Sequence, residues 1–282
     1  MPTNSPRSLR RAPGGTRRNA RRAAVVVSAV LAILAGAASP REAAAQTNPS
    51  GVLGSDDREP MDVSAWPWQA VGQVNYAGYR YRGSCSGALI GPRLVLTAAH
   101  CLIAPWDKKP LPPHDMHFLA GVDKARYAAH SVALCYRFPP GAEKSGPDRY
   151  LPDMHVQRSS VENSANDIAL IVLKDPIPLK PIPVAADAVY EDRRPLVHAA
   201  YPADRRQRLM ADRTCMATSQ TGGLWVTSCD TYPASSGGPV LIERDGSLAV
   251  AGVMVLYVPE VATLAVPVSG WKDFSLTAEC PK

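Results

Sequence analysis

The chain has 282 residues, with 31 Lys and Arg against 25 Asp and Glu and a formal net charge of +6. Eight of the basic residues and one acidic residue lie in residues 1–45, so residues 46–282 carry 23 basic and 24 acidic residues. The positive charge therefore belongs to the N-terminus, and it does not support binding to nucleic acid or to an anionic membrane surface.

The first 45 residues have the composition of an export signal peptide. Seven arginines in residues 7–22 precede an apolar run over residues 23–38, and three alanines follow at 43–45. This order of basic, apolar and small residues is typical of a cleaved signal, and the run is shorter than the roughly 20 apolar residues that span a bilayer. We therefore expect an exported bacterial protein, secreted or periplasmic, with no stable membrane anchor after signal removal. Arg21 and Arg22 leave a twin-arginine export route open.

Short β-rich segments separated by glycine and proline run through the rest of the chain. Their Val, Ile, Leu and Tyr content favours strands of a sandwich or a barrel. Residues 105–117 and 138–163 are expected loops, residues 271–278 have the pattern of a short helix, and four prolines in 176–183 indicate an extended linker. The clearest expected strands are residues 71–76, 88–97, 168–173, 196–201, 239–242 and 248–256.

Three local patterns suggest the chemistry. His100 beside Cys101 follows an apolar strand, Asp167 directly precedes a buried strand, and Ser236 is followed by two glycines and a proline. A serine hydroxyl is a weak nucleophile that needs an adjacent base, and an imidazole can take and return its proton. A buried carboxylate orients the imidazole, and the glycines allow backbone N–H groups to converge on a developing oxyanion. We therefore select His100, Asp167 and Ser236 as candidate catalytic residues.

These patterns resemble the conserved boxes of the chymotrypsin-like serine peptidases. Thr-Ala-Ala-His-Cys at 97–101 and Asn-Asp-Ile-Ala-Leu at 166–170 match the family's histidine and aspartate boxes, and residues 234–239 resemble its serine box. The resemblance covers residues 51–272. It implies an all-β fold of two six-stranded Greek-key β-barrels, with the active site in the cleft between them and a short C-terminal helix.

Within that family, residues 52–58 and 229–237 are similar to the bacterial branch that includes the glutamyl endopeptidases. The expected organisation has five parts: an export signal at 1–45, an N-terminal segment at 46–60, a first barrel with His100 and Asp167 at 61–175, a linker at 176–184, and a second barrel with Ser236 and a C-terminal tail at 185–282.

The serine box departs from the family at two positions. The resemblance implies an oxyanion hole built from the backbone N–H groups of Ala234 and Ser236. Ala234 stands where the family usually has glycine, and alanine resists a positive φ, so the hole is either intact at some strain or impaired. Ser235 stands where animal members carry an aspartate that pairs with a newly cut N-terminus, so that activation switch is absent.

The substrate pocket implied by the resemblance departs from that of the glutamyl endopeptidases. Met254 stands at the position of their carboxylate-binding histidine, whereas Thr231 matches a pocket threonine. Asp230 falls where trypsin has its pocket acid, and it either pairs with Arg or Lys of the substrate or is a structural residue. In the second case, Met254, Val255 and Leu256 would leave a pocket for apolar side chains of medium size.

All six cysteines lie in residues 46–282, and an even number in an exported chain suggests three disulfides. The residues alone allow many pairings. The resemblance implies Cys85–Cys101, a hairpin just before the serine box favours Cys215–Cys229, and Cys135–Cys280 is the pair that remains.

The predicted function is a secreted serine endopeptidase that cleaves a protein or peptide substrate through an acyl-enzyme, without a cofactor. Two alternatives stay open: an esterase with the same triad, and a catalytically impaired binding module, which Ala234 favours. His114 and His117 have a spacing found in metal sites, but their loop offers neither a helix nor a cysteine pair, so no metal site is expected. The sequence leaves the oligomeric state open.

Overall fold

The computed structural model describes residues 50–78, 82–104, 106–142 and 164–281. The expected export signal at 1–45 and most of the expected loop at 138–163 lie outside the described residues. Within the described ranges, no helix is long and apolar enough to cross a bilayer.

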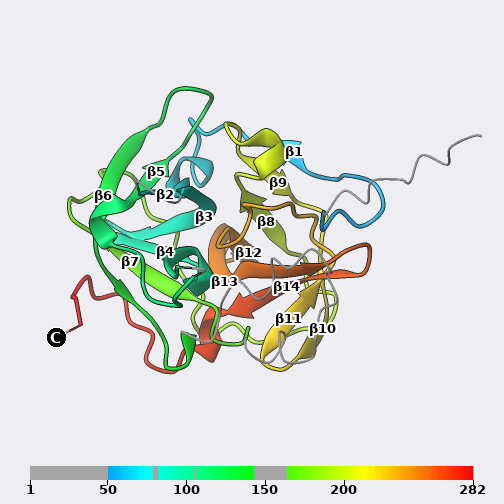
Figure 1. Cartoon of the computed structure of the whole chain (residues 1–282). Coiled ribbons are helices and arrows are strands. Elements are labelled where there is room, and N and C mark those ends of the chain that lie inside the picture. The colour runs from blue at the N-terminus through cyan, green and yellow to red at the C-terminus, as the bar shows by residue number, and fades with distance from the viewer. Residues whose placement is uncertain (1–49, 79–81, 105, 143–163, 282) are drawn as a thin grey trace, which may run out of the picture. The chain divides into compact units, whose positions relative to one another are not determined.

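Six antiparallel strands in the first half of the chain close into a barrel, in the order β2-β3-β4-β7-β6-β5 (Figure 1). The closure is made by β5, which pairs with β2 through Tyr76↔Met116 and Gly72↔Ala120. Alternate residues of β5 are buried, as expected for a strand with one face toward a core. The strands are β2 (Val71–Ala77), β3 (Arg82–Gly91), β4 (Leu94–Thr97), β5 (Met116–Ala120), β6 (Ala129–Arg137) and β7 (Ala169–Leu173).

The second half forms a sheet in the order β1-β9-β8-β12-β13-β14-β11-β10. Within it, β9 and β10 continue one another, because β8 pairs with β9 through His198↔Asp212 and the bridge Pro195↔Met216 extends this pairing toward β10. The pairing of β8 thus extends toward both β9 and the start of β10, and β1 is added beside β9. The strands are β1 (Glu59–Pro60), β8 (Val197–Ala200), β9 (Met210–Asp212), β10 (Ala217–Thr221), β11 (Leu224–Thr227), β12 (Pro239–Arg244), β13 (Ser247–Val258) and β14 (Ala262–Pro267).

The structure confirms the all-β fold with a closed six-stranded barrel and a second sheet, and it corrects some of the expected elements. The single strand expected at 88–97 is the hairpin β3–β4, because the turn contains Pro92, which has no N–H for a ladder. The short C-terminal helix is the single 3-10 turn η7 (Val268–Gly270), and residues 271–278 are not helical. Strands β1, β5, β6, β9, β10, β11 and β14 were not among the clearest expected strands, and β5 begins inside the expected loop at 105–117. The buried face of β6 includes the small residues Ser131 and Ala133, which give little periodic signal.

The described residues contain four other short 3-10 helices: η1 (Trp68–Ala70), η2 (Ala99–Leu102), η3 (Pro113–Asp115) and η6 (Ala203–Arg205). The proline-rich segment 176–184 contains no strand and follows the first barrel. The N–H groups of Ile177 and Ile182 donate to the carbonyls of Pro92 and Leu89. Val184 then forms a bridge with Val250 of β13, so this segment connects the two sheets.

Candidate active site

Strand pairing brings His100 and Asp167 together. His100 lies in η2 directly after β4, and Asp167 lies two residues before β7. These two strands are antiparallel neighbours with Thr97 opposite Ala169, so the end of β4 and the start of β7 share one edge of the barrel.

The carboxylate of Asp167 holds His100 through two hydrogen bonds. Its Oδ2 lies 2.8 Å from Nδ1 of the His100 ring, and its Oδ1 accepts the His100 backbone N–H at 2.9 Å. Asp167 is fully buried, and the His100 side chain is 6% exposed. An ionised carboxylate can only accept, so Nδ1 carries the proton and Nε2 keeps its lone pair. This tautomer suits a general base.

Ser236 lies in the turn before β12, and its main chain reaches the histidine box. Its carbonyl accepts the N–H of Ser86 at 2.8 Å and lies 3.8 Å from Sγ of Cys101, the neighbour of His100. The next residue, Gly237, has φ +81°, and a Cβ there would lie 2.2 Å from Oγ1 of Thr97. Only glycine therefore allows the serine turn to approach the histidine box this closely.

The serine turn leaves two backbone N–H groups available. The N–H groups of Ser235, Gly237 and Gly238 donate to carbonyl groups, whereas no hydrogen bond joins the N–H of Ala234 or Ser236 to another described residue. Ala234 has φ +74°, the left-handed region that the sequence analysis considered unfavourable for alanine. The backbone thus adopts the glycine-like conformation despite the Cβ of Ala234.

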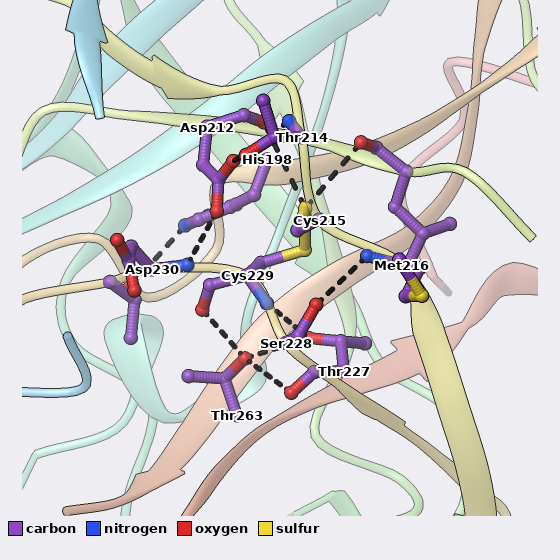
Figure 2. The surroundings of a disulfide bond; sticks show 12 residues. His198, Asp212, Thr214, Cys215, Met216, Thr227, Ser228, Cys229, Asp230 and Thr263 are labelled. Atoms are coloured by element: carbon purple, nitrogen blue, oxygen red, sulfur yellow. Dashed lines mark hydrogen bonds between the residues drawn. A yellow bond between two sulfur atoms is a disulfide. The ribbon is translucent and has the colours of Figure 1, made fainter. Parts of the chain in front are cut away.

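Three disulfides join the pairs that the sequence analysis expected: Cys85–Cys101, Cys135–Cys280 and Cys215–Cys229. The first links β3 to η2 and therefore ties the residue beside His100 to the barrel wall. The third lies just before the serine turn, beside Asp212 and Asp230 (Figure 2).

Asp230, one of the expected pocket residues, binds the N-terminal segment instead. The residue is 2% exposed, and its carboxylate accepts the N–H of Leu53 at 2.8 Å and the N–H of Asp57 at 2.7 Å. Its own N–H donates to Asp212 at 2.9 Å (Figure 2). Burial, the largest influence, raises the pKa of the Asp230 carboxyl, and the two hydrogen bonds oppose this. Both carboxylate oxygens accept hydrogen bonds from the N-terminal segment, as expected if Asp230 is a structural residue.

An ion-pair cluster at Arg58 also fastens the N-terminal segment. Arg58 is 8% exposed and donates to Asp56 at 2.8 Å and to Asp204 at 2.9 Å. Its guanidinium lies 5.6 Å from the ring centre of Tyr232, four residues before Ser236.

His198, which lies in no recognisable motif, packs against the serine turn at Gly238. The residue is 2% exposed, and its Nδ1 and Nε2 each lie 3.3 Å from a partner, the carbonyl of Pro239 and the hydroxyl of Thr231. A Cβ on Gly238 would lie 2.9 Å from its Cε1. Burial lowers the pKa of His198 to about 4, so the ring is neutral at neutral pH.

The other expected pocket residues lie around the same turn. Thr231 forms a two-way backbone bridge with Gly51 at 3.1 Å. Met254 is 1% exposed in an apolar cluster that also contains Cys215 and Trp225, and its backbone bonds to Gly237 and Gly238. Val255 is buried beside it in β13, and Leu256 is half-buried.

The described residues contain one group of potential metal ligands, formed by Cys85, His100 and Cys101. Both cysteines are in a disulfide, so they offer no thiolate to a metal. His114 and His117, whose spacing is also found in metal sites, contact different partners. Nδ1 of His117 lies 2.9 Å from Nε2 of His130, while the His114 side chain is 80% exposed beside Asp115.

Curated proteins with similar sequences include a plasminogen activator and an endopeptidase. Tissue-type plasminogen activator of Pongo abelii is 24% identical over 237 residues, which cover 68% of this chain and 38% of the activator. Glutamyl endopeptidase of Bacillus licheniformis is 40% identical over 52 residues, covering 18% of this chain and 15% of that protein. The chain thus spans less than two fifths of the length of these relatives.

Solved structures share the fold. A Glu endopeptidase in complex with MPD has a TM-score of 0.60 at 16% identity, covering 77% of this chain and 94% of that one. The VesB protease of Vibrio cholerae has a TM-score of 0.56 at 17% identity, covering 77% and 65%. The family model of the trypsin-like peptidase domain matches residues 85–251, more than half of the chain. The chain therefore belongs to the trypsin-like peptidase family.

Proposed function

We propose that this chain is an exported serine endopeptidase that cleaves protein or peptide substrates through an acyl-enzyme. The observation that carries the proposal is the doubly hydrogen-bonded His100–Asp167 pair beside the Ser236 turn. Its Nδ1–H tautomer leaves Nε2 free to act as a base, and family membership makes a peptide bond the expected target.

In the proposed reaction, Nε2 of His100 takes the proton of the Ser236 hydroxyl as Oγ attacks the scissile carbonyl carbon. The resulting oxyanion is stabilised by the N–H groups of Ala234 and Ser236, which donate to no other described residue. The C–N bond then breaks, and the imidazolium returns its proton to the leaving amine. Water repeats the sequence on the acyl ester, and Asp167 stabilises the imidazolium in both halves.

The organisation proposed from the sequence fits this reaction. His100 follows β4 and Asp167 precedes β7 of the first barrel, whereas Ser236 precedes β12 of the second sheet. We propose the boundaries 61–175 and 185–282 for these two parts. Residues 46–60, as far as they are described, attach to the second sheet through β1 and Asp230. Three disulfides are consistent with export to an oxidising compartment.

Labelling and hydrolysis by matched variants test the proposal. Ser236→Ala and His100→Ala should each lower hydrolysis of a protein substrate by ~10⁴-fold or more while the fold survives. Ser235→Ala is the control, because Ser235 is the adjacent serine but is 1% exposed with its hydroxyl against the backbone N–H of Tyr232. Ser235→Ala should lower hydrolysis far less than Ser236→Ala does.

A fluorophosphonate probe should label the wild type and Ser235→Ala but not Ser236→Ala. Full hydrolysis by Ser236→Ala would overturn the assignment. A wild type that is folded but is neither labelled nor active would instead support the impaired binding module. Cleavage of esters without any cleavage of peptides would support the esterase.

A further inference from the structure

Ser86 connects the histidine box to the serine turn through its main chain. It lies in β3 next to Cys85 and is fully buried. Its N–H donates to the carbonyl of Ser236 at 2.8 Å, and its carbonyl accepts the hydroxyl of Thr97 at 2.7 Å. The Ser86 backbone thus contacts residues close to both proposed reacting groups.

The Ser86 hydroxyl makes two further hydrogen bonds, both across the interface between the two halves. It accepts the N–H of Tyr201 at 2.8 Å, and it donates to the carbonyl of Ala234 at 3.1 Å. Tyr201 is held in turn, because its phenol oxygen lies 2.8 Å from the N–H and 3.2 Å from the carbonyl of Val122. Because Oγ of Ser86 accepts the Tyr201 N–H, its own proton is left to donate to the carbonyl of Ala234.

The two carbonyl groups that Ser86 binds flank one of the proposed oxyanion donors. The carbonyl of Ala234 belongs to the peptide before the Ser235–Ser236 peptide, and the carbonyl of Ser236 belongs to the peptide after it. Ala234 has φ +74°, a conformation that alanine keeps only where its surroundings impose it. The Ser86 hydroxyl is a hydrogen-bond donor to that same residue.

We propose that Ser86 is a positioning residue, whose hydroxyl holds the strained Ala234 peptide in the orientation that aims the N–H groups of the serine turn at the oxyanion. The inference rests on the proposed function and names a residue outside the triad and the oxyanion hole. It also accounts for an alanine at 234, because the hydroxyl stabilises a conformation that glycine would adopt unaided.

Steady-state kinetics of Ser86→Ala test the inference. We expect kcat to fall by about 10- to 100-fold, less than the ~10²–10³ typical of losing an oxyanion donor outright, with KM little changed. Ser131→Ala is the matched control, because Ser131 is also buried in the first barrel and accepts the N–H of Asp175 at 3.1 Å. It loses a comparable hydroxyl away from the serine turn, so its kcat should equal that of the wild type.

A rescue separates positioning from a merely structural role. Glycine adopts a positive φ without strain, so Ser86→Ala combined with Ala234→Gly should recover most of the kcat of Ala234→Gly alone. Ser86→Thr and Ser86→Val make a second comparison, because threonine and valine have nearly the same size and branching and only threonine keeps the hydroxyl. We expect the higher kcat in Ser86→Thr.

Each outcome decides the inference. Unchanged kcat in Ser86→Ala, absence of rescue by Ala234→Gly, or equal kcat in the threonine and valine variants would overturn the positioning role while the proposed function stands. A folded wild type that neither reacts with the fluorophosphonate nor cleaves peptides would overturn the proposed function, and this inference with it.

Discussion

Replacing Asp230 by asparagine tests whether this residue holds the N-terminal segment or recognises the substrate. Its two carboxylate oxygens accept the N–H groups of Leu53 and Asp57. Asparagine keeps the size but turns one acceptor into a donor, so one of these N–H groups loses its partner. Hydrogen bonds to charged groups contribute about 1.5–3 kcal/mol. Because Leu53 is half-buried and Asp57 is exposed, water can reach a donor that has lost its partner, and we expect the free energy of unfolding to fall by about 1.5–3 kcal/mol.

Urea denaturation measures this change, with both proteins carrying Ser236→Ala to prevent self-digestion. The control is Asp187→Asn, which removes a carboxylate whose side chain is 70% exposed and paired with Arg244. An exposed ion pair contributes little, so the control should unfold at nearly the same urea concentration as its parent. A similar loss of free energy of unfolding in both variants would mean that the hydrogen bonds of Asp230 stabilise the protein no more than an exposed ion pair does.

The same substitution in the active protein tests specificity. If Asp230 is structural, the residue preference of Asp230→Asn in a peptide library should match that of the wild type, with a lower rate as the N-terminal segment loosens. Unchanged stability together with lost cleavage after Arg or Lys would refute the reasoning, because it would place the carboxylate in the substrate pocket.

Two further predictions concern pH and substrate choice. The pKa of His198 is about 4 in the folded protein and about 6.5 in an unfolded chain. The unfolded chain therefore binds this proton first, and stability should fall by about 3 kcal/mol as the pH drops from about 6.5 to 4. In His198→Gln, the free energy of unfolding should depend less on pH between about 6.5 and 4. The same dependence on pH in the variant and the wild type would contradict a lowered pKa at His198. Met254 is apolar and cannot offset the desolvation of a charged group, so a peptide library should show no dominant cleavage after Glu; dominant cleavage there would show that another group binds the carboxylate.

Several residues of the candidate site could be predicted from the sequence, because each lies in a short stretch with its own local structure. The strand ending at Thr97 and the strand after Asp167 are apolar and β-prone, so His100 and Asp167 could be placed at strand ends before any pairing was known. The turn at Ser236 contains its own glycines, so a tight turn at this position could be predicted from the sequence. Strand β6 was missed because small residues on its buried face carry little of the periodic signal.

The tertiary structure decided the roles that depend on distant partners. By itself, the sequence determined the candidate triad, the all-β class and the two readings of Asp230, but not the choice between them. Asp230 and Leu53 are 177 positions apart, and Ser86 and Ala234 are 148 apart. The residue type of a carboxylate or a hydroxyl is the same whether the group contacts a substrate, solvent or a backbone N–H. Only the packing of the N-terminal segment and of β3 against the serine turn supplies the partner, and the partner determines what each polar group does.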